Sequence, residues 1–273
     1  MATMMEPVML ETKSSVKLKK EQFLQAVADS RESALLLDFD GTLAPFRIDP
    51  MQVRLWAGVR GLLQQIQDES RTRIVIVTGR PALDIEPLLA LREPFEIFGV
   101  HGAERLYPSG RLEQDELLPQ QRQALVGARN TIRSTPMKLG VRVEEKWNAI
   151  AMHWRGVSAR SLYAAQKLCL ELLNPFADVP GMQLLRFDGG LELRAGRNKG
   201  DAVLQVLAEL QSDSPIAYLG DDATDEDAFQ TLGDRGLGVL VRRQWAPSAA
   251  HLWLRPPADL LIFLAAWLDA VQQ

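Results

Sequence analysis

One segment, LLLDFDGT, constrains the fold of this chain more than any other. Its apolar run at 34–37 contains no polar residue, which is typical of a strand that helices cover on both faces. The run ends directly at Asp38, and Asp40 follows two residues later. Because residues i and i+2 of an extended segment point to the same side, the two carboxylates are expected to converge where the strand ends.

Further apolar runs repeat this pattern along the chain. The segment WAGVRGLLQQIQ lies between the first two runs and has apolar residues at helical spacing, so strand, helix and strand succeed one another as in a parallel unit. We therefore predict an α/β fold with a doubly wound parallel sheet. The further runs are RIVIV at 73–77, IFGV at 97–100, IAYL at 216–219 and GLGVLV at 236–241.

The middle of the chain predicts a smaller α+β unit inserted into the first. GVRVEEK and NAIAMHWR look like paired strands, and MQLLRFDGGLELRA is a hairpin signal because two alternating runs flank a glycine-rich turn. Strands joined by short turns are antiparallel, unlike those of the main sheet. The predicted parts are an N-terminal extension (1–30), a core (31–105 and 195–273) and an inserted cap (106–194).

Polar side chains follow the predicted strands where these end: Asp38 with Asp40, then Thr78, then Asp221 with Asp222. In an open parallel sheet, ligands bind outside the carboxyl ends of the strands. Crowded carboxylates repel one another, so a positive charge is expected among them. Mg²⁺ meets this need with oxygen ligands, since it takes one or two carboxylates together with water and substrate phosphate. We therefore predict Mg²⁺ as the cofactor.

Two plainer interpretations of Asp38 and Asp40, a calcium loop and a turn cap, fit the sequence less well. A calcium loop requires an oxygen ligand and then glycine at its fifth and sixth positions, where this chain has Thr42 and Leu43. An aspartate that caps a turn at Gly41 would explain one carboxylate. It would not explain why a second strand also ends in two aspartates.

Composition limits the classes of partner. The net charge of −4 gives no basic excess of the kind that nucleic-acid binding usually requires. The apolar segment near the C-terminus, LLIFLAAWL, is far shorter than the ~20 residues of a membrane span, and we expect a buried helix face there. The N-terminus lacks the order of a signal peptide, and the single cysteine, Cys169, fits a reducing compartment. We expect a cytoplasmic monomer or weak oligomer that binds a small molecule.

Four motifs in order resemble those of the haloacid-dehalogenase-like phosphohydrolases. The motifs are DFDGT at 38–42, VTGR at 77–80, NKGDAV at 198–203 and GDDATDEDAF at 220–229. The finer resemblance is to trehalose-6-phosphate phosphatases, on the segments LAPFRIDP, GVHGAER, VEEKWNAIAMHWR, GLELRAGRNKG and GDDATDE. Two residues depart from that pattern: Trp147 stands where glycine is common, and Arg194 where lysine is common.

The resemblance implies a role for most candidate residues. It implies that Asp38 is a nucleophile and Asp40 an acid and base, that Thr78 and Lys199 bind phosphate, and that Asp221 joins Asp38 and Asp40 as a metal ligand. Glu144, Lys146 and Glu192 would contact the sugar from the cap. Beyond the resemblance, Arg80 and Glu104 are substrate-binding candidates. Asp222 and Asp225 would orient the groups around the metal without binding it themselves. We expect His101 to be a buried, hydrogen-bonded histidine.

These roles form a consistent chemistry. Uncatalysed hydrolysis of a phosphate monoester is extremely slow, and an aspartyl-phosphate intermediate divides it into two easier steps. The sequence therefore predicts a Mg²⁺-dependent phosphatase that acts on trehalose 6-phosphate. Alternatives are a phosphatase for another sugar phosphate, such as glucosylglycerol phosphate or mannosyl-3-phosphoglycerate, a phosphotransferase or mutase, and a sugar-phosphate sensor without catalysis.

Overall fold

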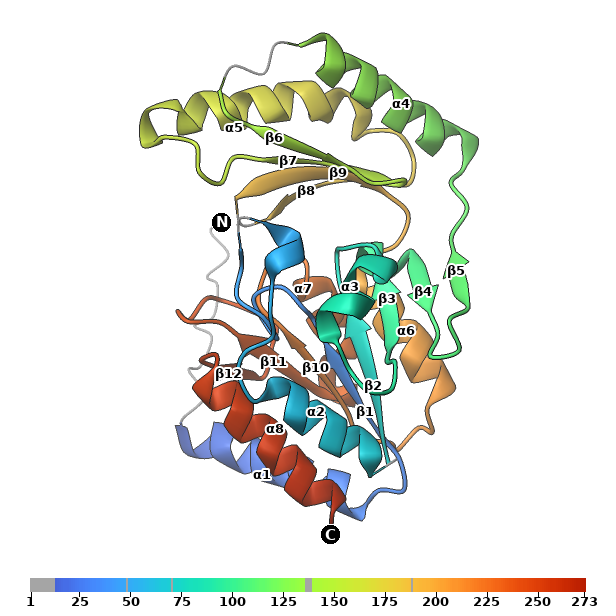
Figure 1. Ribbon diagram of the computed structural model, residues 1–273, viewed down its shortest axis with the longest axis vertical. Helices are drawn as coiled ribbons and strands as arrows, with labels where there is room; N and C mark the ends of the chain where they lie inside the picture. Colours follow the sequence, from blue (N-terminus) through green and yellow to red (C-terminus); the bar gives the residue numbers. More distant parts are fainter. Residues whose placement is uncertain (1–12, 48, 70, 136–138, 188) are drawn as a thin grey trace, which may run out of the picture.

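The computed structural model describes residues 13–47, 49–69, 71–135, 139–187 and 189–273 (Figure 1). Over these residues the chain folds into a larger core and a smaller cap, which lies over one end of the core (Figure 1). Residues 1–12 of the predicted N-terminal extension lie outside the described residues. The rest of that extension forms the helix α1 (Lys13–Asp29), which packs against the C-terminal helix α8 (Ala258–Val271).

Within the described residues, the core sheet has eight strands in the order β12-β11-β10-β1-β2-β3-β4-β5. The strands from β12 to β3 run parallel, and β4 and β5 are antiparallel additions at one edge. The bounds are β1 (Ser33–Leu37), β2 (Thr72–Val77), β3 (Glu96–Gly99), β4 (Glu104–Leu106), β5 (Leu112–Gln114), β10 (Ile216–Gly220), β11 (Leu237–Val241) and β12 (Leu252–Leu254).

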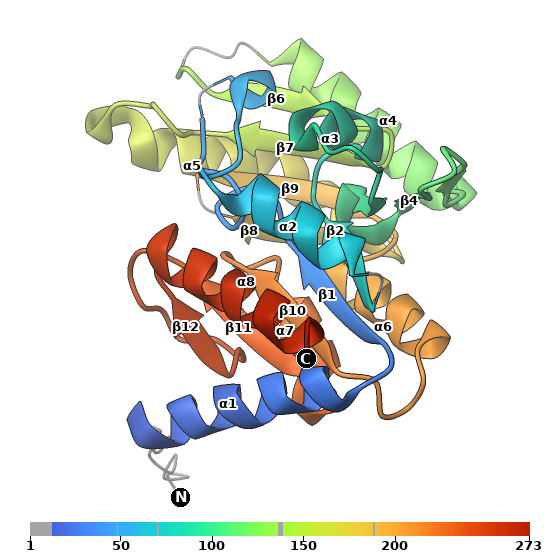
Figure 2. The same cartoon turned by 60° about the horizontal axis from the view of Figure 1, so that its bottom comes forward.

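Strand β1 shows why its sequence is apolar throughout. Leu35 and Leu37 belong to a cluster that the helices α1, α2, α3 and α8 complete on one face of the sheet. Ala34 and Leu36 belong to a second cluster, which α6 and α7 complete on the opposite face (Figure 2). The predicted doubly wound fold is therefore confirmed. The helices are α2 (Val59–Asp68), α3 (Ala82–Leu89), α6 (Lys199–Glu209) and α7 (Glu226–Leu232), with short 3₁₀ turns at Pro50–Gln52, Val100–Gly102 and Gly233–Arg235.

The order of the strands positions the site. The chain proceeds from β1 through β2 to β3 on one side and returns through β10 and β11 on the other, so the direction of winding reverses between β1 and β10. Open α/β sheets bind ligands in the crevice at this reversal, outside the carboxyl ends of the strands. Asp38 follows β1 and Asp221 follows β10, so the two aspartates flank the crevice.

The cap contains a separate antiparallel sheet in the order β6-β7-β9-β8, in the part of the chain that the structure describes. The helices α4 and α5 cover the face that points away from the core (Figure 1). The predicted strand pair and hairpin are confirmed. The bounds are α4 (Pro119–Ser134), β6 (Arg142–Glu145), β7 (Ala149–His153), α5 (Ala159–Leu173), a 3₁₀ turn at Asn174–Phe176, β8 (Met182–Phe187) and β9 (Gly190–Ala195).

The start of the cap differs from the sequence-based expectation. Residues 106–114 were assigned to the cap, but β5 pairs with β4, and β4 pairs with β3 of the core sheet. The physical reason is that a tight turn after Leu106 returns the chain to the sheet edge before it leaves the core. We therefore propose that the cap begins at 115–118 and returns to the core at 195–198.

None of the helices in the described residues has both the length and the hydropathy that crossing a membrane would require. The apolar C-terminal segment forms α8, whose residues Phe263, Leu264 and Trp267 are fully buried against the core sheet. The predicted buried helix face is thus confirmed.

Candidate active site

Asp38 lies at the bottom of a crevice and forms a buried ion pair with Lys199. Its Oδ1 accepts a hydrogen bond of 2.8 Å from Lys199 Nζ, although the two residues are 161 positions apart. Lys199 is the first residue of α6, and the start of this helix lies where its ammonium group can reach the end of β1. Asp38 and Lys199 are each 3% exposed. This burial makes the ion pair much stronger than the same pair would be in water.

Asp225 organises the acidic loop after β10. Its Oδ1 accepts hydrogen bonds from Lys199 Nζ and Tyr218 Oη, both at 2.7 Å. Its Oδ2 accepts from the backbone N–H groups of Asp221 and Asp222, at 2.9 and 3.0 Å. Four hydrogen bonds use the normal accepting capacity of a carboxylate. Asp225 therefore fixes its neighbours rather than offering an oxygen to a ligand.

The side chains of Asp38, Asp221 and Asp225 bring oxygens within 4.8 Å of one another, a spacing that suits a metal ion. Asp38 Oδ2 is buried and has no hydrogen-bond partner in the described residues. Gly41 allows Asp221 to approach, because a Cβ on Gly41 would lie 2.1 Å from Asp221 Oδ2. The orphaned oxygen of Asp38 and the adjacent Asp221 carboxylate are therefore suited to hold a divalent cation.

The electrostatics support the same conclusion. Burial raises the pKa of Asp38 well above its usual value, although Lys199 opposes this shift. Burial and the neighbouring Asp38 likewise raise the pKa of Asp221. For Lys199, burial lowers the pKa, but Asp225 and Asp38 more than offset this and raise it overall. One ammonium group therefore leaves the acids underneutralised, and a bound cation would keep both carboxylates ionised.

Asp40 does not join the acidic cluster in this structure. Both of its carboxylate oxygens accept hydrogen bonds from Arg80, one of them from Nε at 2.6 Å. Arg80 also donates to the backbone oxygen of Pro50 at 2.6 Å. This hydrogen bond connects the loop after β2 to the loop after β1. Thr78 is 1% exposed and lies two residues before Arg80, where its Oγ1 accepts from the Arg80 N–H at 3.2 Å.

A cleft of about 700 Å³ separates these core residues from the cap, and both lobes line it. Side chains alternate along the cap strands, so Glu144 and Glu192 face the cleft while Val143, Leu191 and Leu193 face the helices. The strand register brings Glu144 opposite Ala151, and Ala151 opposite Glu192. Because the middle residue is alanine, the two carboxylates flank a gap rather than a bulky side chain.

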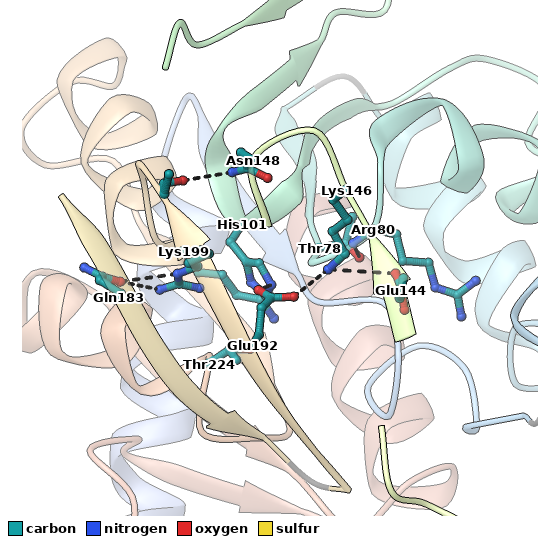
Figure 3. A network of polar contacts seen from close by, with 12 residues as sticks. Thr78, Arg80, His101, Glu144, Lys146, Asn148, Gln183, Glu192, Lys199 and Thr224 are labelled. Atoms are coloured by element: carbon teal, nitrogen blue, oxygen red, sulfur yellow. Dashed lines mark hydrogen bonds and ion pairs between the residues drawn. The ribbon is translucent and has the colours of Figure 1, made fainter. Parts of the chain in front are cut away.

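The cap residues in the cleft form one polar network. Lys146 Nζ lies 2.8 Å from Glu192 Oε2 and 4.0 Å from Glu144 Oε1 (Figure 3). Glu144 also contacts His153 Nε2 at 2.9 Å, and this hydrogen bond lowers the pKa of Glu144. Burial would raise the pKa of Glu192, but Lys146 and His101 lower it below its usual range. Both glutamates are thus ionised acceptors suited to hydroxyl groups.

Glu104 does not line the cleft, although it was expected to contact substrate. It is 6% exposed, and its carboxylate accepts hydrogen bonds from the Ala82 N–H and from Trp147 Nε1. The unusual Trp147 therefore connects the cap to the core. Asp222 lines the cleft and shapes its own loop, because its Oδ1 accepts from both the N–H and the hydroxyl of Thr224.

Two residues that matter here carry no local sign in the sequence. Tyr218 lies inside an apolar run, and only its position beneath the site lets its hydroxyl reach Asp225. Ala151 looks like any small strand residue, and its role as a gap depends on its neighbours in the sheet. His101 was expected to be a buried, hydrogen-bonded histidine, and its imidazole is buried and contacts Glu192 of the cap.

Comparison with known proteins agrees with this geometry. The family model described as trehalose-phosphatase matches residues 36–251. The chain is 31% identical over 226 residues to a trehalose-phosphate phosphatase of Mycobacterium tuberculosis, which covers 78% of this chain and 54% of that protein. It therefore spans about half the length of this relative. A probable trehalose-phosphate phosphatase of Oryza sativa is 27% identical over 261 residues, covering 90% of this chain and 69% of the relative.

Solved structures show the same fold. The C-terminal domain of a trehalose-6-phosphate phosphatase from C. albicans superposes with a TM-score of 0.76 at 20% identity, covering 92% of this chain and 96% of that one. A trehalose-6-phosphate phosphatase related protein gives a TM-score of 0.66 at 26% identity, covering 88% of this chain and all of the other.

Proposed function

The chain belongs to the trehalose-phosphatase family, and on this premise we propose that it hydrolyses trehalose 6-phosphate to trehalose and inorganic phosphate. One observation carries the proposal. A buried carboxylate, Asp38, has one oxygen on Lys199 and one for which the described residues offer no hydrogen-bond partner, and it lies across a cleft from the cap carboxylates of Glu144 and Glu192. The core end of the cleft suits a phosphoryl group, and the cap end suits sugar hydroxyls.

In the first step, an oxygen of Asp38 forms a bond to phosphorus while the bond from phosphorus to the sugar oxygen breaks. Asp40 supplies a proton to the departing sugar oxygen. In the second step, Asp40 takes a proton from water, whose oxygen attacks the aspartyl-phosphate and releases phosphate with Asp38 restored. Because Arg80 holds Asp40, we propose that the incoming phosphate takes over Arg80 and frees Asp40 to reach the leaving oxygen.

Lys199 and Thr78 would stabilise the phosphoryl oxygens during transfer. The Lys199 ammonium is fixed by Asp225, so it offers a positive charge that needs no reorganisation. The Thr78 hydroxyl is buried at the cleft and can donate a hydrogen bond. Asp38 and Asp221 would hold Mg²⁺, which would neutralise charge on the carboxylates and the phosphate, whereas the predicted third ligand, Asp40, has its carboxylate bound by Arg80 in this structure.

The cap would supply specificity. Glu144 and Glu192 offer ionised acceptors, and Lys146 offers a donor, on the two sides of the Ala151 gap. Sites that hydrogen-bond a substrate's hydroxyl groups discriminate strongly against analogues that lack them. A sugar phosphate would engage these three residues, whereas a small aryl phosphate would reach only the core.

The test is phosphate release from trehalose 6-phosphate, compared with glucose 6-phosphate, glucosylglycerol phosphate, mannosyl-3-phosphoglycerate and an aryl phosphate. We expect the largest kcat/KM for trehalose 6-phosphate, loss of activity in EDTA and recovery with excess Mg²⁺. Equal kcat/KM values for all the sugar phosphates would refute the assigned substrate. Isomerised sugar without free phosphate would instead identify a mutase.

We further propose that the protein is cytoplasmic and that the chain is monomeric or associates weakly. Gel filtration of the purified protein at several concentrations measures its state of association. A stable dimer at micromolar concentration would refute that part of the proposal.

A further inference from the structure

His101 lies in a strained segment of the core, between β3 and β4. Val100 and His101 have φ values of +48° and +59°, and Gly102 follows at +100°. Left-handed backbone is unusual for residues with a side chain and is especially unfavourable for β-branched valine. Such strain persists only where surrounding structure overdetermines it, and it clusters at functional sites. The position of His101 is therefore held by its surroundings and not by local preference.

The hydrogen bonds that hold this segment come from the loop that carries Thr78. The N–H of His101 donates to the backbone oxygen of Thr78, and the N–H of Val100 donates to that of Arg80, both at 2.8 Å. The imidazole lies against Gly79, because a Cβ on that glycine would be 2.6 Å from His101 Cε1. His101 is thus fixed directly to the proposed phosphate-binding loop.

From this anchor the imidazole reaches the cap. His101 Nε2 lies 3.2 Å from Glu192 Oε1, while Lys146 Nζ occupies the other oxygen of Glu192 at 2.8 Å (Figure 3). His101 Nδ1 is buried without a partner in the described residues, and burial lowers the pKa of His101 to about 4. At neutral pH the imidazole therefore carries one proton, which lies on Nε2 and is donated to Glu192.

We propose that His101 is a positioning residue, which couples the phosphate-binding loop of the core to Glu192 of the cap and so sets the spacing between the phosphate and sugar sites. The inference rests on the proposed function, because it assumes that Glu192 contacts the sugar. Lys146 and Glu192 both belong to the cap, so their contact does not link the cap to the core. Among the described residues, His101 contacts both Glu192 and the loop that carries Thr78.

The test uses two variants of His101. Asn tolerates left-handed backbone but is too short to reach Glu192, whereas the amide nitrogen of Gln lies near the position of Nε2. We expect His101→Asn to lower kcat/KM for the preferred sugar phosphate by about 10- to 100-fold, the loss that a displacement of ~1 Å produces. The kcat/KM for an aryl phosphate should change less than about twofold, and His101→Gln should recover most of the loss.

Controls separate positioning from folding. His251→Asn removes an imidazole that accepts a hydrogen bond from Gly238 in the core, and both substrates should be unaffected. In a Glu192→Gln background, His101→Asn should have little further effect, since the two residues act as one unit. Equal losses on both substrates, additive effects in the double variant, or no recovery with Gln would each overturn the proposal.

The tautomer provides a readout without substrate. The chain has three histidines, so ¹⁵N imidazole spectra can be assigned by substitution. We expect the Nε2–H form for His101 at pH 7, and an Nδ1–H form would overturn the inference. A wild-type enzyme that releases no phosphate from any sugar phosphate would instead refute the proposed function, while the spectra still decide the contact with Glu192.

Discussion

Asp225→Asn tests whether the acidic site is held together by the buried ion pair. Asn keeps the volume of the side chain and one oxygen, which can still accept from the N–H groups of Asp221 and Asp222. Its amide NH₂ would then face the Lys199 ammonium, and because both groups are donors they cannot hydrogen-bond to each other. Lys199 keeps its ion pair with Asp38, but the hydrogen bonds from Lys199 and Tyr218 to the Asp225 carboxylate are lost, and hydrogen bonds to a charged group contribute about 1.5–3 kcal/mol each. We therefore expect the free energy of unfolding to fall by about 3 kcal/mol or more.

An exposed pair with similar geometry provides the matched control. Arg92 and Asp68 lie 2.8 Å apart, but their side chains are 69% and 58% exposed. Exposed pairs contribute about 0–1 kcal/mol, so Asp68→Asn should reduce the free energy of unfolding by no more than that. Burial, rather than distance, should account for the difference between the two variants.

Urea unfolding in EDTA measures both variants without a contribution from bound metal, and linear extrapolation gives each free energy. The initial rate of phosphate release should also fall by at least about 100-fold in Asp225→Asn, because Lys199 loses its fixed position. A destabilisation within about 1 kcal/mol of that of Asp68→Asn would refute the reasoning. The acids would then be organised by something other than Asp225.

Further variants probe the nucleophile, the cap and an ion pair remote from the cleft. Asp38→Asn should reduce turnover of every phosphate monoester by at least about 1000-fold, and near-normal rates would exclude Asp38 as the nucleophile. Glu144→Ala should lower kcat/KM for trehalose 6-phosphate by about 10- to 100-fold with an aryl phosphate nearly unaffected, whereas equal losses would assign Glu144 to structure. Ala151→Leu should show the same selectivity because it fills the gap, and unchanged kcat/KM would exclude the gap as a sugar site. Hydrogen bonds from Arg105 lower the pKa of Glu209 to about 2, so this carboxylate stabilises the fold above about pH 4.5 and less as the pH falls toward 2. Between pH 5 and 2, the urea midpoint of Glu209→Gln should therefore decline less than that of the wild type. Midpoints that decline equally in the two proteins would contradict this.

Much of the core could be predicted because its signals are local. The run at 34–37 is buried on both faces, as its lack of polar residues predicted, and the helical segment between it and the next run predicted that the strands are parallel. The antiparallel hairpin of β8 and β9 was equally predictable from two alternating runs and a glycine-rich turn. The addition of β4 and β5 to the core sheet could not be predicted, because short edge strands gain their stability from the sheet they join.

Part of the candidate site could likewise be predicted from the sequence, and part could not. The acids of β1 and β10 are expected together because both strands end at one edge of the sheet. The pairing of Asp40 with Arg80 and the withdrawal of Glu104 to Trp147 depend on side-chain contacts between distant segments. The positions of the strand ends predict roughly where Asp40 and Glu104 lie. They do not predict which of the several side chains within reach each of them binds.

The sequence by itself determined the type of sheet, the acids at its edge and the insertion of a cap, because each rests on periodicity or residue type within a few positions. Only the tertiary structure decided that Ala151 separates two carboxylates and that His101 meets Glu192. Both arrangements depend on strand register and on how the cap lies over the core. These are set by the packing of the whole chain and not by any one segment.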